Sequence, residues 1–596
     1  MALAPIAAPN AARSATTLRA WARALETTAE ASRDPERILP RAVLEWARSY
    51  GDALALVSDR ERFSFSALAA RMNQYSRWVL EAGIAPGETI ALVMGNRPEY
   101  FAIWLGLIQV GAVAALTSPN LRAPALAHAF NVASARRIIA AAECADVCGE
   151  ARLDGAEIWI HGGGGSGGRR IDRAISRHSG TPLGSGERRP VTLADRALRI
   201  FTSGTTGLPK AAEVSHRRVV LWTHWFAGLA GLTAEDRLYN CLPMHHSVGG
   251  VVAISSPLVF GGSVAIAERF SARGFWDDVT RFDCTAFQYI GELCRYLVAA
   301  PIRPEEKAHR LRLAIGNGLA PDVWRALLDR FGPLHILEFY ASTEGNVWLY
   351  NVEGKIGSIG RPPPYLAARD QIALARFNHE SLTPVRGADG LCERCVDGEI
   401  GEALGRIVDD PGKGFEGYSE GDETEQKILH NVFALGDQWM RSGDLMRRDA
   451  EGFYTFIDRI GDTFRWKGEN VSTVEVSSVL GACPGVREAI VYGVVVPGAD
   501  GRAGMASLTI DERFDLVSLL NRLEALPRYA RPRFLRIVGQ IASTETFKPR
   551  WREYAAEGFD PARVGDPLYV LDYERKEYVP LDAKRFAAIR TGAMRL

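Results

Sequence analysis

The chain has 596 residues, of which 47% are hydrophobic and 24% charged, so it is long enough for at least two domains with large cores. Lys plus Arg (71) equals Asp plus Glu (71), which argues against a nucleic-acid partner and favours a small-molecule partner. The eight cysteines are spread thinly and we find no secretory signal, so we expect reduced thiols in a cytoplasmic protein.

Residues 1–41 are predicted to form an N-terminal extension. The first 25 residues contain Arg13, Arg19 and Arg23 and no acidic residue, which is a weak resemblance to a transit peptide. Because Ala and Arg are abundant throughout the chain, we expect a frayed N-terminus instead.

Residues 42–460 alternate helical patterns with short β-rich runs, such as 89–94 and 137–140, which predicts βαβ units and a mainly parallel sheet. Residues 101–116 are too short for a membrane span and are expected to form a buried helix that runs into a strand. The glycine run 162–165 is predicted to be a flexible surface loop, because no strand is expected before it and no Lys-Ser/Thr follows it.

The C-terminal part of the chain changes pattern twice. Candidate strands at 399–407 and 452–457 predict a β-rich subdomain, in which Cys392 and Cys395 form one CxxC pair without the further ligands of a zinc site. After residue 461, strands at 490–496 and 506–510 and a helix at 516–526 predict a compact α+β domain. The predicted fold class is therefore α/β: a large multi-subdomain N-terminal domain (42–460) and a small mobile α+β C-terminal domain (461–596).

A dense run of hydroxyl groups and glycines follows the apolar residues 197–200, with the sequence Phe201-Thr-Ser-Gly-Thr-Thr-Gly-Leu-Pro-Lys210. Gly204 and Gly207 let backbone N–H groups approach a polyphosphate, Lys210 supplies positive charge, and hydroxyl donors come from Ser203, Thr205 and Thr206. The pattern is not Walker A, because no Ser or Thr follows the lysine. We predict a triphosphate cradle, with a polar turn that binds nothing as the alternative.

A second cluster, Tyr340-Ala-Ser-Thr-Glu-Gly-Asn346, follows the strand-like residues 334–339. An aromatic face such as that of Tyr340 can stack on adenine. Thr343 and Glu344 offer hard oxygen atoms suited to Mg²⁺ that is bound to phosphate.

A third cluster, Arg441-Ser-Gly-Asp444, precedes a β-rich run that ends in Asp458-Arg459. The carboxylate of Asp444 can accept both hydroxyls of a ribose, and Arg459 can donate to ribose or phosphate. A surface salt bridge is the alternative for both residues.

Together these motifs resemble the adenylate-forming superfamily of acyl-CoA synthetases, peptide-synthetase adenylation domains and luciferases. The resemblance is closest to the fatty acid transport protein and very-long-chain acyl-CoA synthetase family and extends from about residue 42 to the C-terminus. The segments that mark this branch are Tyr289-Ile-Gly-Glu-Leu-Cys-Arg-Tyr296, Ala314-Ile-Gly-Asn-Gly-Leu319, Asp458-Arg-Ile-Gly-Asp-Thr-Phe-Arg-Trp-Lys-Gly-Glu-Asn-Val471 and Asp566-Pro-Leu-Tyr-Val570.

The resemblance implies a role for each matching position. The β- and γ-phosphates are held by Thr202, Ser203, Gly204, Thr205, Thr206, Gly207 and Lys210. Adenine is framed by Gly316, Asn317, Gly318 and Tyr340. Phosphate and Mg²⁺ are met by Thr343 and Glu344, and the ribose is bound by Asp444 and Arg459.

Three further roles follow from the same resemblance. His246, with His245 as its neighbour, matches a histidine beside the acyl carboxylate, Lys548 matches the lysine that reaches in for adenylation, and Gly461 falls at the hinge. As bare residues, either histidine could lie on the surface, and a lysine near a chain end is usually solvated. Glu545 departs from the family glycine near Lys548, Pro549 biases that lysine toward extended backbone, and Ala341 replaces a common glycine.

The resemblance implies a long-chain or very-long-chain fatty acid:CoA ligase that uses ATP, Mg²⁺ and coenzyme A. It forms acyl-AMP and pyrophosphate, and then acyl-CoA and AMP. The alternatives are an adenylating enzyme for other carboxylic acids or for a carrier-protein acceptor, and a fatty-acid uptake component with coupled acyl-CoA synthesis. We expect a cytoplasmic protein without a nucleic-acid partner; peripheral attachment to the inner face of the membrane and the oligomeric state are open.

Overall fold

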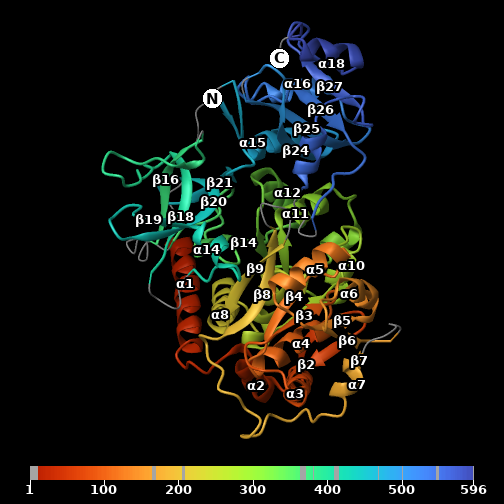
Figure 1. Ribbon diagram of the computed structural model, residues 1–596, viewed down its shortest axis with the longest axis vertical. Helices are drawn as coiled ribbons and strands as arrows, with labels where there is room; N and C mark the ends of the chain where they lie inside the picture. Colours follow the sequence, from red (N-terminus) through yellow and green to blue (C-terminus); the bar gives the residue numbers. More distant parts are fainter. Residues whose placement is uncertain are drawn as a thin grey trace.

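We describe the protein from a computed structural model. The described residues are 11–163, 169–203, 209–362, 371–379, 381–408, 415–467, 469–499, 501–544, 549–594 and 596. Figure 1 shows a large α/β part, a β-rich subdomain beside it, and a small α+β domain that contains the C-terminus. The predicted fold class, a large α/β part followed by a small α+β domain, is confirmed, while the domain boundaries and the mobility of the small domain stay predictions.

The first large sheet has the strand order β7-β6-β5-β3-β4-β8-β9 in the described part of the chain. Its neighbours pair in parallel except β9, which runs antiparallel to β8. The strands are β3 (Thr89–Val93), β4 (Val113–Thr117), β5 (Arg137–Ala141), β6 (Glu157–His161), β7 (Arg169–Arg170), β8 (Arg196–Ser203) and β9 (Pro209–Ser215). Since β6 ends directly before the glycine run at 162, the expectation that no strand precedes this run was wrong; residues 164–168 lie outside the described ranges.

The second large sheet has the order β15-β14-β13-β12-β10-β11-β1-β2, again counted over the described ranges. Its central strands are parallel, and the edge strands β2 and β15 are antiparallel to their neighbours. The strands are β1 (Leu54–Val57), β2 (Arg62–Ser64), β10 (Arg237–Asn240), β11 (Ser263–Ile266), β12 (Ala286–Ile290), β13 (Leu313–Asn317), β14 (His335–Tyr340) and β15 (Leu349–Asn351).

Helices cover both sheets. The longer ones in this part are α2 (Leu39–Tyr50), α3 (Phe65–Glu81), α4 (Pro98–Gln109), α5 (Ala123–Val132), α8 (His216–Ala230), α11 (Gly291–Ala299) and α12 (Pro321–Phe331). The side chain of Ser215 starts α8 by accepting the Arg218 N–H at 3.2 Å, and Gly231 ends it in the left-handed conformation, with φ 60°.

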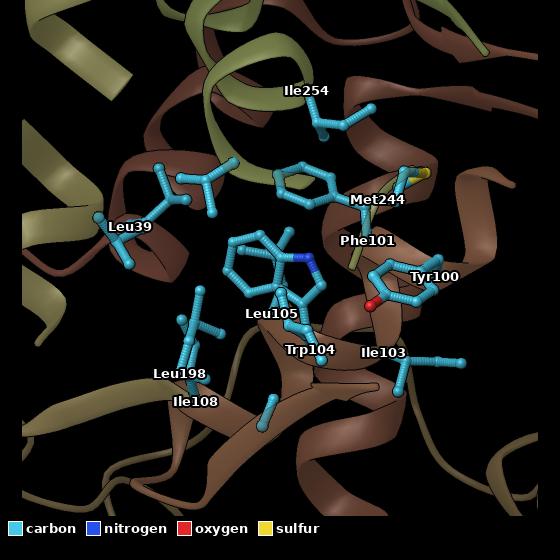
Figure 2. Packing of buried hydrophobic residues seen from close by; sticks show 14 of the residues in the cluster. Leu39, Tyr100, Phe101, Ile103, Trp104, Leu105, Ile108, Leu198, Met244 and Ile254 are labelled. Atoms are coloured by element: carbon cyan, nitrogen blue, oxygen red, sulfur yellow. The ribbon is translucent and has the colours of Figure 1, made fainter. Parts of the chain in front are cut away.

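Helix α4 is buried on every side, which explains its almost wholly apolar sequence. It is followed by β4, as predicted for residues 101–116. Figure 2 shows its side chains in the central core, together with residues of other elements: Phe101, Trp104, Leu105 and Ile108 of α4, and Leu198, Met244 and Ile254. Among the described residues, no helix is long and apolar enough to cross a membrane.

The N-terminal residues 11–31 form helix α1 (Ala11–Ala31), so the expectation of a frayed terminus was wrong for them. Figure 1 shows α1 alongside α8. Trp21 is 2% exposed, and its ring centroid lies 5.8 Å from that of Trp225 and 5.9 Å from that of Tyr350. Burial of this indole against the aromatic rings of two distant elements fixes the helix.

The β-rich subdomain contains β16 (Ile372–Asn378), β17 (Thr383–Pro384), β18 (Ile400–Arg406), β19 (Ile428–His430), β20 (Gln438–Arg448) and β21 (Tyr454–Arg459), all in antiparallel pairing. The backbone N–H of Cys395 donates to the Leu374 carbonyl of β16 at 2.9 Å.

The small domain has its own hydrophobic core, which includes Phe464, Tyr492 and Phe534. Its main sheet has the order β24-β25-β26-β27-β28 within the described ranges. Its elements are β22 (Phe464–Trp466), β23 (Glu469–Val471), α15 (Thr473–Gly481), β24 (Val486–Val495), β25 (Arg502–Ile510), α16 (Leu516–Leu523), β26 (Phe534–Ile537), α17 (Trp551–Glu557), β27 (Leu568–Asp572), β28 (Glu577–Pro580) and α18 (Ala583–Arg590).

Candidate active site

The structure brings the second and third sequence clusters together. The Tyr340 hydroxyl, at the end of β14, donates to Oδ2 of Asp444 on β20. Arg459 lies opposite Asp444 in the β20–β21 pair, and its Nε is 3.4 Å from Asp444 Oδ1. Asp444 is only 7% exposed, whereas the Arg459 side chain is 49% exposed, so the ion pair joins a buried carboxylate to an exposed guanidinium.

Half of the first cluster lies outside the described residues: Gly204, Thr205, Thr206 and Gly207 fall in 204–208. The described flanks are Thr202 on β8 and Lys210 on β9, which are register partners in an antiparallel hairpin. A hairpin differs from the strand–loop–helix arrangement of a Walker A loop, in keeping with the sequence pattern.

Thr343 and Glu344 lie between this hairpin and the His246 segment. Thr343 Oγ1 is 3.1 Å from Ser247 Oγ, and the Thr343 carbonyl accepts from Arg218 Nη1 at 2.7 Å. Glu344 Oε1 accepts from the Tyr418 hydroxyl at 2.8 Å. Burial raises the pKa of Tyr418, followed by the charge and hydrogen bond of Glu344, while a hydrogen bond with Thr202 acts in the opposite direction.

His246 is half-buried and His245 is buried, with 4.3 Å between their ring centroids. They are followed by a single π-helical turn, Val248–Val252, a rare feature that often occurs at functional sites. A Cβ at Gly250 would lie 1.8 Å from the Met244 carbonyl oxygen, so the close turn requires glycine.

The predicted adenine segment ends β13 and turns toward α12. A Cβ at Gly316 would lie 2.2 Å from the Tyr289 carbonyl oxygen, and Gly318 has φ +79°, so both positions require glycine. Oδ1 of Asn317 is buried and has no hydrogen-bond partner within the described part of the chain. An unpaired polar atom at this place suits a polar ligand.

The buried carboxylate of Glu338 fixes this turn by hydrogen bonds. Its Oε1 accepts the N–H groups of Gly318 (2.6 Å) and Leu319 (3.1 Å), and its Oε2 accepts from the Tyr289 hydroxyl. Burial raises the pKa of Glu338 to about 7, although these three donors act to lower it. The turn is therefore fixed by an ionisable group.

Of the other predicted residues, Gly461 lies between β21 of the β-rich subdomain and β22 of the small domain. Gly461 follows β21 with φ +95°, and, its two chain neighbours aside, no heavy atom of the described residues lies within 4 Å of a Cβ placed on it. Asp458, 1% exposed, accepts from the Arg459 N–H at 2.8 Å and from the Thr473 N–H of α15 at 2.6 Å. Lys548 and Glu545 lie outside the described residues.

Sequence reasoning missed five polar residues of this region. Glu338 carried one signal, since a charged residue interrupts an apolar strand directly before Tyr340. No sequence pattern indicated Arg218, or the three residues in segment 416–423, because the residues that they contact are remote in the chain. The missed residues are Arg218, Glu338, Glu416, Tyr418 and Glu423.

With this geometry in place, comparison with known proteins defines the class. The AMP-binding enzyme family matches residues 43–369, and the AMP-binding enzyme C-terminal domain matches residues 475–548. The chain belongs to the AMP-binding enzyme family, and the predicted enzyme class, an AMP-forming acyl-CoA synthetase, is confirmed.

Within this class, the chain belongs to the long-chain fatty acid transport protein family. Long-chain fatty acid transport protein 1 of Mus musculus is 39% identical over 559 residues, covering 92% of this chain and 86% of that protein. Long-chain fatty acid transport protein 2 of Rattus norvegicus is 38% identical over 578 residues, covering 95% and 92%. The family predicted from the sequence motifs is thereby confirmed.

Solved structures show the same fold at lower identity. The anthranilate CoA ligase AuaEII in complex with anthranoyl-AMP is similar with a TM-score of 0.73 at 21% identity, over 86% of this chain and 97% of that one. ATP-bound MatB from Rhodopseudomonas palustris is similar with a TM-score of 0.71 at 21% identity, over 87% of this chain and 98% of that one.

We expect Asp444→Asn to raise the KM for ATP, because the variant loses a buried charged acceptor. A hydrogen bond to a charged group contributes about 1.5 to 3 kcal/mol, which corresponds to about 10- to 150-fold in kcat/KM for ATP. The KM for the acid should change much less. The control is Asp329→Asn on the exposed face of α12. Wild-type kinetics for ATP in Asp444→Asn would contradict the assignment.

We expect Glu338 to make stability depend on pH. Its pKa is raised from 4.5 to about 7 in the folded protein, so the folded state binds this proton more tightly. The stability that protonation contributes is present below pH 4.5 and is lost as pH rises to about 7, by roughly 3 kcal/mol at most. The melting temperature of Glu338→Gln relative to wild type should therefore increase between pH 5 and pH 8. The exposed Glu574→Gln is the control, and an equal difference at both pH values would refute the shift.

Proposed function

We propose that the protein is a long-chain or very-long-chain fatty acid:CoA ligase that works through an acyl-adenylate. The observation that carries the proposal is the contact of the buried Asp444 carboxylate with Tyr340 and Arg459. It joins two separate nucleotide-type motifs in a chain 39% identical to a protein named for long-chain fatty acids.

A carboxylate is a poor acyl donor because oxide is a poor leaving group. In the first step, a carboxylate oxygen of the fatty acid attacks the α-phosphorus of ATP and pyrophosphate leaves. In the second step, the CoA sulfur attacks the acyl carbon, AMP leaves, and the thiol proton passes to solvent. A thiol with a pKa of roughly 8.5 is partly ionised near neutrality, so neither step requires a protein nucleophile.

The protein's part is positioning and charge stabilisation. Tyr340 and the segment Gly316, Asn317 and Gly318 frame the base. Asp444 and Arg459 bind the ribose, and the phosphates lie along Thr202 and Lys210. His246 lies beside the acyl carboxylate.

Magnesium fits the residues that are present. Glu344 supplies a half-buried carboxylate and Thr343 a hydroxyl, and oxygen atoms of this kind are what Mg²⁺ prefers. When bound, the ion neutralises charge on the phosphates. Lys548 is proposed to add a second positive charge during adenylation.

Three alternatives to this function differ in the acid, in the acceptor or in the principal role. The acid could be shorter, branched or a sterol side chain; the acceptor could be a carrier protein; and the principal role could be fatty-acid uptake, as the relatives' names suggest.

The test is a panel of acids from short to very long chain, with ATP, Mg²⁺ and CoA, in which AMP, pyrophosphate and acyl-CoA are measured. We expect long chains to give all three products in equal amounts. Release of ADP and phosphate would contradict the proposal. Turnover with a carrier protein that bears a free phosphopantetheine thiol, but not with free CoA, would favour the second alternative.

Because Lys548 and CoA are needed in different steps over one site, we propose that the small domain turns about Gly461. Gly461→Pro fixes φ near −65°, which differs from the +95° found here, so one orientation of the domain should be lost. We expect adenylation, measured by pyrophosphate exchange, to persist better than thioester formation. Gly461→Ala should be affected less, and wild-type rates of both steps in folded Gly461→Pro would exclude this pivot.

A further inference from the structure

A segment of the β-rich part, residues 415–425, runs along the hairpin that carries Lys210; we name it the strap. The Ser419 N–H donates to the Ala211 carbonyl at 2.9 Å, and the Glu213 N–H donates to the Gly417 carbonyl at 3.1 Å. Between them, Ala212 and Tyr418 form an antiparallel bridge. The strap is thus paired to the edge strand β9.

One end of the strap is fixed by Glu416. Its carboxylate accepts from the Ser215 N–H (2.7 Å) and hydroxyl (2.6 Å), and it lies 3.5 Å from Arg218 Nε. Arg218, 4% exposed, in turn donates to the Thr343 carbonyl. These contacts tie the strap to the segment that carries Glu344.

Near the other end of the strap, the carboxylate of Glu423 contacts the ammonium of Lys210. Glu423, in the short helix α14 (Gly421–Glu425), forms an ion pair with the Lys210 ammonium. Both side chains are largely buried, with 19% and 24% exposed. The Lys210 ammonium also lies 5.9 Å from the ring centroid of Tyr418. Lys210, proposed above as a phosphate ligand, therefore has an anionic partner within the protein.

We propose that Glu423 is a positioning residue that competes with the nucleotide polyphosphate and with pyrophosphate for the Lys210 ammonium. This inference rests on the proposed function, because it assigns to Lys210 the phosphates of ATP. Glu423 holds the Lys210 ammonium at the strap and provides an alternative anion when pyrophosphate leaves.

The physical reason is that one ammonium cannot satisfy two anions fully. Polyphosphate carries more charge than a carboxylate, so the Lys210 ammonium pairs with polyphosphate when it is bound. Because the Lys210–Glu423 pair must first break, the net free energy of polyphosphate binding is less favourable. Glu423 therefore weakens the binding of pyrophosphate and speeds its release. It acts through Lys210 and does not touch the reacting atoms.

The test compares Glu423→Gln with Glu425→Gln, an exposed residue of the same helix that makes the same charge change. In Glu423→Gln we expect the inhibition constant of inorganic pyrophosphate to fall about three- to ten-fold at low salt, with a matching fall in the KM for ATP. Both values should stay at wild type in Glu425→Gln. Glu423→Asp should restore most of the wild-type behaviour.

The effect should disappear when Lys210→Met is present, since Glu423 then has no ammonium to compete for. Equal values for the two glutamine variants, or weaker pyrophosphate binding in Glu423→Gln, would overturn the inference. Calorimetric titration with pyrophosphate measures the same difference without turnover. Failure of the wild-type protein to make acyl-CoA would count against the proposed function, whereas the titration would still decide the role of Glu423.

Discussion

The constraint on which the site depends is the burial of the Asp444 carboxylate. A charge with 7% exposure requires strong partners, and Asp444 finds them in the hydroxyl of Tyr340 and the guanidinium of Arg459. Tyr340 ends β14 of a large sheet, and Arg459 ends β21 of the β-rich subdomain. Their bonds to Asp444 of β20 therefore hold these three strands together. The same carboxylate thereby lies beside Tyr340, which is proposed to contact the base.

The pair of Asp444 and Arg459, proposed to bind the ribose, is also joined to the small domain. Asp458, adjacent to Arg459, is buried, and its carboxylate binds the Thr473 N–H at the start of α15. Burial raises the pKa of Asp458, while its hydrogen bonds act to lower it. The turn that contains Gly461 lies between Asp458 and Thr473 in the chain. A rotation at this glycine would therefore change the position of the small domain while β20 and β21 keep Asp444 and Arg459 in register.

Much of the fold and of the site could be predicted from the sequence because the signals were local. The apolar residues 197–200 lie in β8 and the strand-like residues 334–339 overlap β14, and the polar residues after them are the basis of the predicted nucleotide site. The contact of Tyr340 with Asp444 spans 104 residues and was not predicted, since the family resemblance assigned the two residues to adenine and ribose separately. Helix α1 was missed because its sequence is rich in Ala and Arg like the rest of the chain, and its order depends on Trp21 meeting Trp225 and Tyr350. The strap was missed because Glu423 has no local pattern and acquires its role only where it meets Lys210.

The central claim is that a fatty carboxylate attacks the α-phosphorus of ATP in this site. The most direct measurement uses a long-chain acid with both carboxyl oxygens replaced by ¹⁸O, together with ATP and CoA, and mass spectrometry of the products. The account predicts one ¹⁸O atom in AMP for each acyl-CoA formed and none in pyrophosphate. Label in inorganic phosphate with formation of ADP, or acyl-CoA formed with unlabelled AMP, would contradict it.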